Sequence, residues 1–297
     1  MISNTKGFGL VLKTLLVILL ILFIFSVIKT CSDCARIAVI EKTGYLPDDE
    51  NWDSIPDIDP PYNPDDIDSL PDAVSIESLF PPIGNQGSYG TCVAWAVGYN
   101  MKTALNAREN HWDENQLKNP ANQTSPKDLW MAIPSMQKGA MCQGTIFEAA
   151  FSALQSIGAE SMKNIPYISM GNCSGTAAGN PSNKIQSFGC LTAKPDTSNL
   201  QIYKAYIRDS IPLVISARIG DRFVEWNSDA VIDHDSYKYR GQHAYHAMVL
   251  SGYDDSRNSF RVRNSWGSEW GDNGSIWVDY NFFCNSFCLE IFVGSNK

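Results

Sequence analysis

One cysteine, preceded by a glycine-rich stretch and followed far downstream by a histidine and an asparagine, constrains this chain more than any other feature. Residues 86–92 read Gln-Gly-Ser-Tyr-Gly-Thr-Cys. His246-Ala247 and then Asn264-Ser265-Trp266-Gly267 follow in that order. Together they supply a thiol nucleophile, a base, a group that orients the base and an amide donor for an oxyanion. The pattern therefore indicates a cysteine enzyme that acts on acyl groups.

The bulk composition is that of a globular protein. The chain has 297 residues, of which 44% are hydrophobic and 19% charged, so one large domain or two lobes can form a core without the help of disulfides. The formal net charge is −9, and no basic patch stands out. Because binding to nucleic acid depends on positive charge opposite the phosphates, we expect no nucleic-acid partner.

The first 30 residues predict a membrane segment. Residues 15–28 are an apolar run without a charge, and an extension back to Phe8 gives 21 residues interrupted only by Lys13. As a helix this run spans roughly 31 Å, enough for a hydrocarbon core. It is either a retained single-pass signal anchor or a cleaved signal peptide. Both alternatives export the rest of the chain, which is then membrane-anchored and extracytoplasmic, or secreted.

An acidic, proline-rich linker is expected over residues 31–72. Its second half, residues 48–72, carries ten acidic residues and no Lys or Arg, and six prolines when Pro47 is counted. Proline favours an extended chain and like charges repel, so this stretch should be extended and solvated. It is either a spacer or an inhibitory or docking segment.

Eight cysteines fit an exported protein in which some of them pair. If Cys92 stays a thiol, seven remain, so at least one is left over or pairs with another chain. Local bridges are possible for two close pairs, Cys31 with Cys34 and Cys284 with Cys288. Neither pair has a histidine or a second pair at ligand spacing, so no metal site is expected.

The periodicity predicts helices first and strands later. Apolar residues recur every four positions after Cys92, and further helices are expected over residues 145–157 and 200–207. From residue 211 the pattern changes to strands, at residues 211–219, 247–253, 259–264 and 276–280. This order indicates an α+β chain with two lobes rather than alternating βαβ units.

Cys92 and His246 are the expected reacting pair. Cys92 stands where a helix begins, and the positive end of a helix favours a thiolate. Of the four histidines, His246 leads directly into a strand, whereas His243 is expected at the rim and His111 and His234 at the surface. We expect the thiolate and a charged imidazole to meet as an ion pair between the two lobes.

Three further groups would complete this site. Asn264 ends the strand that follows the His246 strand across a turn, so in an antiparallel hairpin the two side chains come within reach. Trp266 would cover their contact. The side-chain amide of Gln86 and the backbone N–H of Cys92 would converge on the oxygen of a tetrahedral intermediate. Glycines in the same loop, Gly90 among them, would let backbone approach a substrate.

With these motifs the sequence resembles the papain family of cysteine peptidases, from about Leu70 to the C-terminus. The resemblance implies a peptidase domain over residues 73–297, with a helical left lobe at about 92–205, a β-barrel-like right lobe at about 206–297 and a cleft between them. It implies polypeptide substrates, no metal or organic cofactor, and four catalytic residues: Cys92 as nucleophile, His246 as general acid/base, Asn264 as orienter and Gln86 as oxyanion donor.

The chain departs from the family pattern around the cleft. Tyr89 replaces a cysteine, so Cys142, Cys173 and Cys190 are expected to pair in a new way. A glycine pair after Cys142 reads Gln143-Gly144, and these two residues, with Gly90 and Trp266, are the expected substrate contacts. The long inhibitory prosegment of the family is absent, so latency through a folded propeptide is not expected.

Two other functions remain open on the sequence alone. One is a papain-like binding protein whose active site is spent. The other is an acyl transferase or peptide ligase that uses the same thiol chemistry.

Overall fold

The computed structural model describes residues 43–46, 67, 70–139, 142–171, 173–236 and 244–297. The expected membrane segment and most of the expected linker lie outside these ranges. Within them, no helix is long and apolar enough to cross a bilayer. Residues Glu41–Lys297 form one compact unit.

Eight strands form one sheet. Their order is β2-β8-β3-β5-β6-β7-β4, with β1 paired to β5, and all pairs are antiparallel except β4 with β7. Four of the strands are those expected from the sequence, namely β3, β5, β6 and β7. The strand bounds are β1 Ala73–Ser75, β2 Ser187–Thr192, β3 Leu213–Ile219, β4 Val231–Ile232, β5 Ala244–Asp254, β6 Ser259–Arg263, β7 Ser275–Asp279 and β8 Cys288–Ser295.

The expectation of a β-barrel-like lobe is wrong, because the described strands form an open sheet. One end is β2, which precedes α7 in the chain and pairs with β8. The other end is β4, whose two residues pair only with β7. Among the described strands β4 makes no pair with β2, so the sheet is open.

The helices are mostly short. A continuous helical stretch runs through α2 (Cys92–Ala94), the π-type segment η4 (Trp95–Lys102) and α3 (Thr103–Asn110). The other helices are α4 Glu114–Lys118, α5 Pro126–Ala132, α6 Phe147–Ser156, α7 Leu200–Arg208, α8 Asp221–Val224, α9 Tyr280–Phe282 and the π-type η10 Phe283–Phe287. Single 3-10 turns are η3 Glu77–Leu79, η5 Ser135–Gln137, η7 Pro181–Asn183, η8 Thr197–Asn199 and η9 Asp255–Arg257.

The long helical stretch forms where the sequence predicts it. The residues that recur every four positions, Val93, Val97, Met101 and Leu105, are all buried. It ends at His111, which takes the left-handed conformation with φ of 52°. Burial of this apolar face fixes the helix, and therefore the position of Cys92 at its start.

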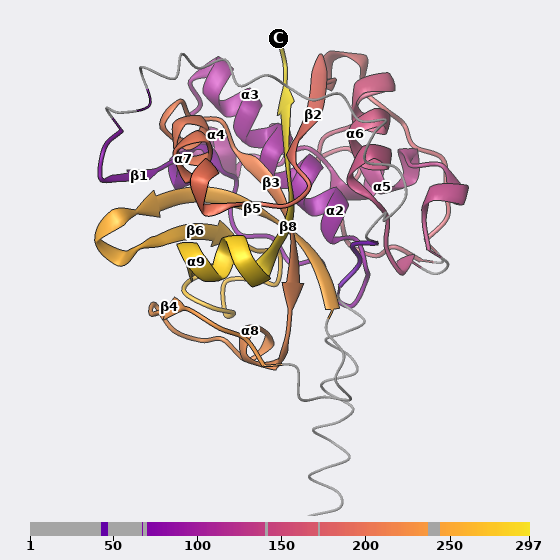
Figure 1. Cartoon of the computed structure of the whole chain (residues 1–297). Helices are drawn as coiled ribbons and strands as arrows, with labels where there is room; N and C mark the ends of the chain where they lie inside the picture. Colours follow the sequence, from indigo (N-terminus) through magenta and orange to yellow (C-terminus); the bar gives the residue numbers. More distant parts are fainter. Residues whose placement is uncertain (1–42, 47–66, 68–69, 140–141, 172, 237–243) are drawn as a thin grey trace, which may run out of the picture. The chain divides into compact units, whose positions relative to one another are not determined.

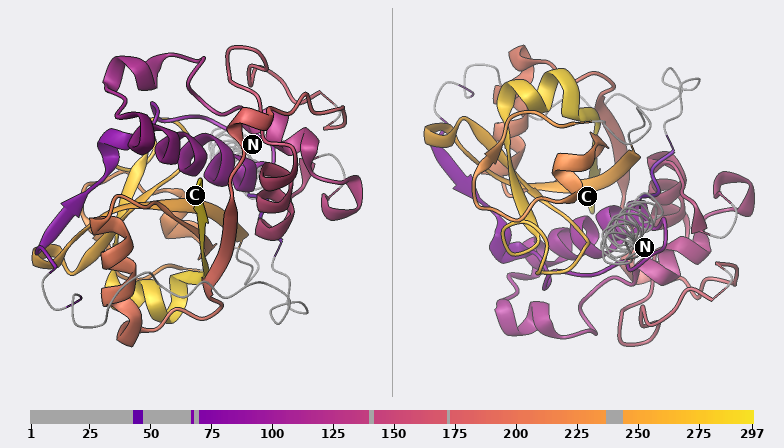
Figure 2. Two further views of the ribbon diagram at one scale, coloured as in Figure 1. Left: turned by 90° about the horizontal axis from the view of Figure 1, so that it is seen from above. Right: turned by 90° about the horizontal axis from the view of Figure 1, so that it is seen from below.

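Helices and sheet meet at the middle of the molecule. Both α2 and η4 pack against β5. In Figures 1 and 2 the helices α2, α3, α5 and α6 gather on one side of the sheet, while α7, α8 and α9 accompany the orange and yellow strands. The contact of α2 with β5 brings the Cys92 end of the helix to the His246 end of the strand.

Candidate active site

Cys92 is the first residue of the helical stretch, as expected, and it is fully buried. Thr91 is the N-cap, but its side chain makes no bond to the helix. Its hydroxyl instead lies 2.7 Å from the hydroxyl of Tyr167. The backbone N–H groups of Gly44 and Ala247 face the Cys92 sulfur. Ala247 directly follows His246, so the thiol and the imidazole belong to the same small region.

His246 and Asn264 are in direct contact, 2.7 Å apart between Nε2 and Oδ1. The same Oδ1 accepts the backbone N–H of Ser265 at 2.7 Å. Since a backbone N–H can only donate, this second bond identifies the atom as the amide oxygen, and His246 Nε2 must therefore carry a proton. In the neutral ring Nδ1 is then the acceptor. It is buried, and no described residue bonds to it.

Trp266 covers this contact, and Gln86 is bonded to Ser265, the residue after Asn264. The Trp266 ring lies over the His246 ring with centroids 4.8 Å apart, as the sequence analysis expected. Gln86 is fully buried. Its Nε2 donates to the carbonyl of Tyr89 at 2.8 Å, and its Oε1 accepts from Ser265 Oγ at 2.7 Å. These contacts fix the plane of the Gln86 amide beside the Cys92 loop.

Tyr167 is a part of the site that the sequence analysis did not assign. Its hydroxyl donates to the backbone carbonyl of Gln86 at 2.9 Å and also meets Thr91. The ring packs edge-on against Trp95 at 4.9 Å. Tyr167 thus links the loop before Cys92 to the helix after it. The Pro166-Tyr167 dipeptide was the only signal for it.

The predicted substrate-binding glycines already enclose a peptide. A side chain at Gly44 would overlap with the backbone of Gly90, and one at Gly144 would overlap with the backbone of Gly44. A side chain at Gly90 would overlap with the carbonyl of Cys142. The carbonyl of Gly44 accepts the N–H of Thr145 at 2.8 Å. Leu46 donates its N–H to the carbonyl of Thr145 at 3.1 Å. Residues 44–46, called the covering segment below, therefore lie as a short strand over the site.

Gln143, the remaining expected substrate contact, is exposed. The covering segment itself had no signature in the sequence. It belongs to the part expected to be a linker, and the only hint is that Gly44-Tyr45-Leu46 is less polar than the acidic stretch that follows. Among the described residues, the one segment that lies over the site is this short strand.

The covering segment changes the charge state expected for the reacting pair. Burial raises the pKa of the Cys92 thiol to about 11, and the N–H groups of Ala247 and Gly44 offset only part of that rise. Burial lowers the pKa of His246 to about 4, although its bond to Asn264 acts in the other direction. Near neutral pH both groups are neutral in this covered state. The thiolate–imidazolium pair expected from the sequence is not favoured there, because burial disfavours both charged forms.

The described cysteines pair as the departures suggested. Cys142 and Cys173 form a disulfide, while Cys92 and Cys190 are in no disulfide. A local bridge between Cys284 and Cys288 is not formed. Cys284 lies inside η10 and Cys288 starts β8, where its thiol points to the carbonyl of Glu290 at 3.4 Å. Cys31 and Cys34 lie outside the described residues.

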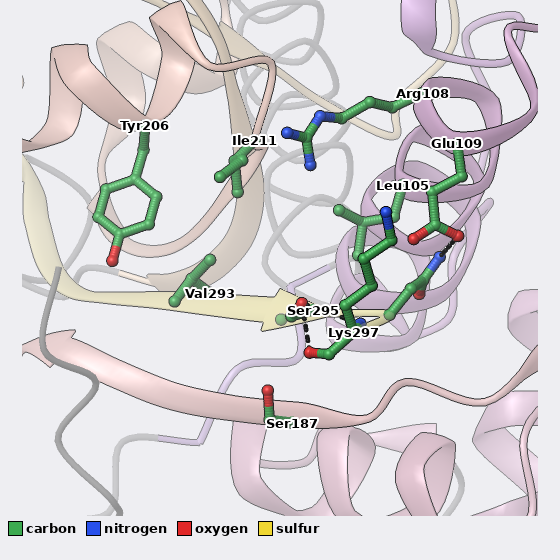
Figure 3. A pocket seen from close by; sticks show the side chains of 11 residues that line it. Leu105, Arg108, Glu109, Ser187, Tyr206, Ile211, Val293, Ser295 and Lys297 are labelled. Atoms are coloured by element: carbon green, nitrogen blue, oxygen red, sulfur yellow. Dashed lines mark hydrogen bonds between the residues drawn. The ribbon is translucent and has the colours of Figure 1, made fainter. Parts of the chain in front are cut away.

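A cavity of about 230 Å³ lies between α3, α7 and the end of β8, and Figure 3 shows Arg108, Tyr206 and Lys297 around it. None of the expected site residues lines this cavity. Within the described ranges, no three His, Cys, Asp or Glu side chains are grouped as metal ligands.

The known proteins that this chain resembles include several cysteine proteases. The sequence profile described as "Papain family cysteine protease" matches residues 68–288. Cysteine protease 1 of Oryza sativa subsp. japonica is 27% identical over 231 residues, which are 74% of this chain and 43% of that protein. Peptidase 1 of Euroglyphus maynei is 24% identical over 233 residues, or 74% of this chain and 63% of that protein.

Solved structures share the fold. Xylellain, a cysteine protease from Xylella fastidiosa, superposes with a TM-score of 0.71 at 19% identity and covers 86% of this chain and 96% of its own. The procathepsin B S9 of Trypanosoma congolense superposes with a TM-score of 0.67 at 16% identity, covering 87% and 88%. By contrast, the chain spans only 43% and 44% of the length of two rice relatives, Cysteine protease 1 and Oryzain beta chain.

Proposed function

Because the chain belongs to the papain family of cysteine proteases, we propose that it is a cysteine-type peptidase that hydrolyses peptide bonds in polypeptides. Cys92 is the nucleophile, His246 the general acid and base, and Asn264 the residue that orients His246. Gln86 supplies a hydrogen-bond donor to the oxyanion. The observation that carries this proposal is the bond between His246 Nε2 and Asn264 Oδ1, because it leaves Nδ1 as the acceptor.

The proposed reaction has two halves. Once the covering segment gives way to a substrate, the Cys92 proton passes to His246 Nδ1 and the sulfur attacks the carbonyl carbon. The negative oxygen is stabilised by Gln86 and by the Cys92 backbone N–H. His246 then protonates the leaving amine, the C–N bond breaks, and a thioester remains. Water attacks the thioester with His246 as base, which releases the acid and restores the thiol.

The family's thiol chemistry needs no metal or organic cofactor. We also propose that the chain is exported, either anchored by residues 1–30 or secreted after their removal. Support comes from the apolar run and from the Cys142–Cys173 disulfide, since disulfides persist in oxidising compartments. We further propose that the peptidase domain comprises residues 73–297.

Replacement of the thiol tests the proposal. Cys92→Ala should abolish peptide cleavage, a fall of at least about 10⁴-fold in kcat/KM, because no other group supplies the nucleophile. The free energy of unfolding should change by less than about 1 kcal/mol, since alanine nearly fills the same space. Cys190→Ala, which removes another buried cysteine that is in no disulfide, is the matched control and should retain cleavage.

The measurement is hydrolysis of a fluorogenic peptide library before and after treatment with iodoacetamide. Cleavage by Cys92→Ala at the wild-type rate would overturn the mechanism. Added amine nucleophiles reveal the alternative chemistry: if amide products outnumber acids at low amine concentration, the chain is a transferase rather than a hydrolase.

A further inference from the structure

The cavity of about 230 Å³ between α3, α7 and the end of β8, called the α3 cavity below, has an apolar wall (Figure 3). Leu105 on α3, Ile211 after α7 and Val293 on β8 form this wall, and Leu105 and Val293 are each only 4% exposed. Tyr206 of α7 adds a buried aromatic ring. Cavities for drug-sized ligands measure roughly 300–1,000 Å³, so this one suits a smaller molecule with an aliphatic or aromatic body.

A guanidinium stands at the rim of the cavity. Arg108 lies in the last turn of α3, and its side chain is exposed. In Figure 3 it extends from α3 toward Ile211, with Tyr206 on the far side. Within the described ranges the Arg108 guanidinium makes no ion pair and no hydrogen bond. Its planar fork of N–H donors is therefore available, and such a fork matches the two oxygens of a carboxylate.

A buried cation lies behind the same wall. Lys102 is 2% exposed, and its Nζ donates to Oδ1 of Asn106 at 2.7 Å and to Oδ1 of Asn296 at 2.9 Å. Asn296 lines the cavity. Burial lowers the pKa of Lys102 to about 8, although the charge of Glu109 opposes that shift, so the ammonium form still predominates at pH 7. A buried ammonium bonded to neutral amides is stabilised by an anion nearby.

Negative charge at the cavity is limited. Glu109 is the one acidic side chain that lines it, and its Oε2 accepts a hydrogen bond from Asn296 Nδ2 at 2.9 Å. Lys297 adds an exposed ammonium, which water screens. Only the Arg108 guanidinium extends over the apolar wall, whereas Lys102 acts from behind Asn296. One carboxylate therefore fits better than a phosphate dianion, which would need several donors facing the ligand.

We propose that the α3 cavity binds a small carboxylic acid with an aliphatic or aromatic body. The carboxylate pairs with the Arg108 guanidinium at the rim, and the body lies against the apolar wall. No residue of the proposed catalytic site lines this cavity. The proposal goes beyond the peptidase function and does not depend on it, because binding can be measured in the Cys92→Ala variant.

Isothermal titration of the full-length Cys92→Ala variant with 4-phenylbutyrate tests the charge and the body separately. 4-Phenylbutanamide, which has the same shape without the charge, should bind at least about tenfold more weakly, because it loses the ion pair with Arg108. Butyrate, which keeps the carboxylate without the ring, should also bind at least about tenfold more weakly, because it buries little apolar surface.

Substitutions in the same background locate the ligand. Arg108→Gln should weaken binding of 4-phenylbutyrate at least about tenfold and leave binding of the amide unchanged. Ile211→Trp, at a half-buried position after α7, should fill the cavity and weaken both at least about tenfold. Lys163→Gln is the matched control, because Lys163 is exposed and does not line the cavity, and it should change neither affinity.

Thermal unfolding checks that each variant is folded. Should Ile211→Trp fail to fold, Ile211→Ala takes its place; it removes part of the apolar wall and should weaken 4-phenylbutyrate about threefold.

The titrations decide the proposal without reference to peptide cleavage. A preference for 4-phenylbutyrate over its amide that disappears in Arg108→Gln supports the site, whether or not the wild-type chain cleaves peptides. The site is overturned if 4-phenylbutyrate shows no binding up to about 10 mM, or if it binds no better than the amide. It is also overturned if Arg108→Gln binds 4-phenylbutyrate as tightly as its parent.

Discussion

Two consecutive residues, Arg263 and Asn264, show how differently this protein treats the polar groups it buries. The Arg263 side chain is an ion-pair partner of Glu77 at 2.7 Å, lies 3.2 Å from Asn100 Oδ1, and donates to the carbonyl of Pro81. Burial lowers the pKa of Arg263, and the charge of Glu77 opposes that shift. This group, called the Arg263 cluster, ties β6 to η3 and η4 with its hydrogen bonds satisfied.

Around Asn264 the polar groups are neutral and incompletely bonded. His246 Nδ1, Asn264 Nδ2 and Trp266 Nε1 are buried and have no hydrogen-bond partner among the described residues. Such groups cost stability, so they persist where something other than stability selects them. The two groups therefore differ in their hydrogen bonding: the buried charge of Arg263 has its partners, whereas three buried polar atoms around Asn264 have none among the described residues.

The largest effect is expected from removal of the charge of Glu77. Glu77→Gln leaves the Arg263 guanidinium buried without its anion, and this should lower the free energy of unfolding by about 3 kcal/mol, the low end for such pairs because Glu77 is 33% exposed. Urea denaturation measures it. Glu114→Gln is the matched control, since its pair with Lys118 is largely exposed and should contribute less than about 0.5 kcal/mol.

Glu77→Gln is expected to leave catalysis almost unchanged. Below its unfolding transition the variant should keep kcat/KM within about threefold, because the cluster holds elements together and touches no reacting atom. A loss of stability below about 1 kcal/mol would show that the Arg263 cluster is no tighter than a surface pair.

A smaller effect, on activity rather than stability, is expected at Asn264. Asn264→Ala removes the acceptor that fixes His246 Nε2–H, so the ring can turn or change tautomer, and kcat/KM should fall about 100-fold. Most of the loss should appear in kcat. Asn285→Ala, at an exposed asparagine bonded only to a backbone carbonyl among described partners, is the control and should change neither constant. Full activity of Asn264→Ala would show that Asn264 has a structural role, like the Arg263 cluster, and does not position His246 for the reaction.

Much of the fold and most of the site were predictable because they depend on local sequence. The period of four after Cys92, the hairpin that holds His246, and the spacing to Asn264 each specify a short piece of structure. Four strands of the sheet followed from the same kind of pattern. The pairing of Cys142 with Cys173 was consistent with the sequence but not determined by it, since Cys190 remained an equal candidate.

What could not be predicted depends on contacts between distant residues. Tyr45 and Glu290 are separated by 245 positions, and neither lies in a motif. The edge strands β2 and β4 are too short or too mixed to show a period, so the open shape of the sheet was missed. The neutral state of Cys92 and His246 follows from burial under the covering segment. The sequence showed only that Cys92 stands at the start of a helix and that His246 is its expected partner, and these two features predicted an ion pair.

The smallest effect expected concerns the pH dependence of Cys92 in the presence and absence of its cover. In wild type, burial raises the pKa of the thiol to about 11, so alkylation should climb about tenfold per pH unit from pH 7 to 10 without a plateau. Tyr45→Ala removes the side chain that seats the segment and lets water reach the sulfur. The thiol pKa should fall by about one unit toward its ordinary value, so a plateau appears above about pH 10 and the rate at pH 7 rises about tenfold.

Uncovering Cys92 changes the alkylation rate in a direction that depends on which form of the thiol reacts. Only the thiolate is alkylated, and burial favours the protonated thiol, so uncovering must raise the rate at neutral pH and leave it little changed near pH 11. Ile168→Ala, a change at an 85% exposed side chain, is the control and should reproduce the wild-type profile. If Tyr45→Ala also climbs without a plateau, the covering segment is not what keeps Cys92 neutral. Burial of Cys92 and His246 by the rest of the domain, without the covering segment, would then be what keeps both groups neutral.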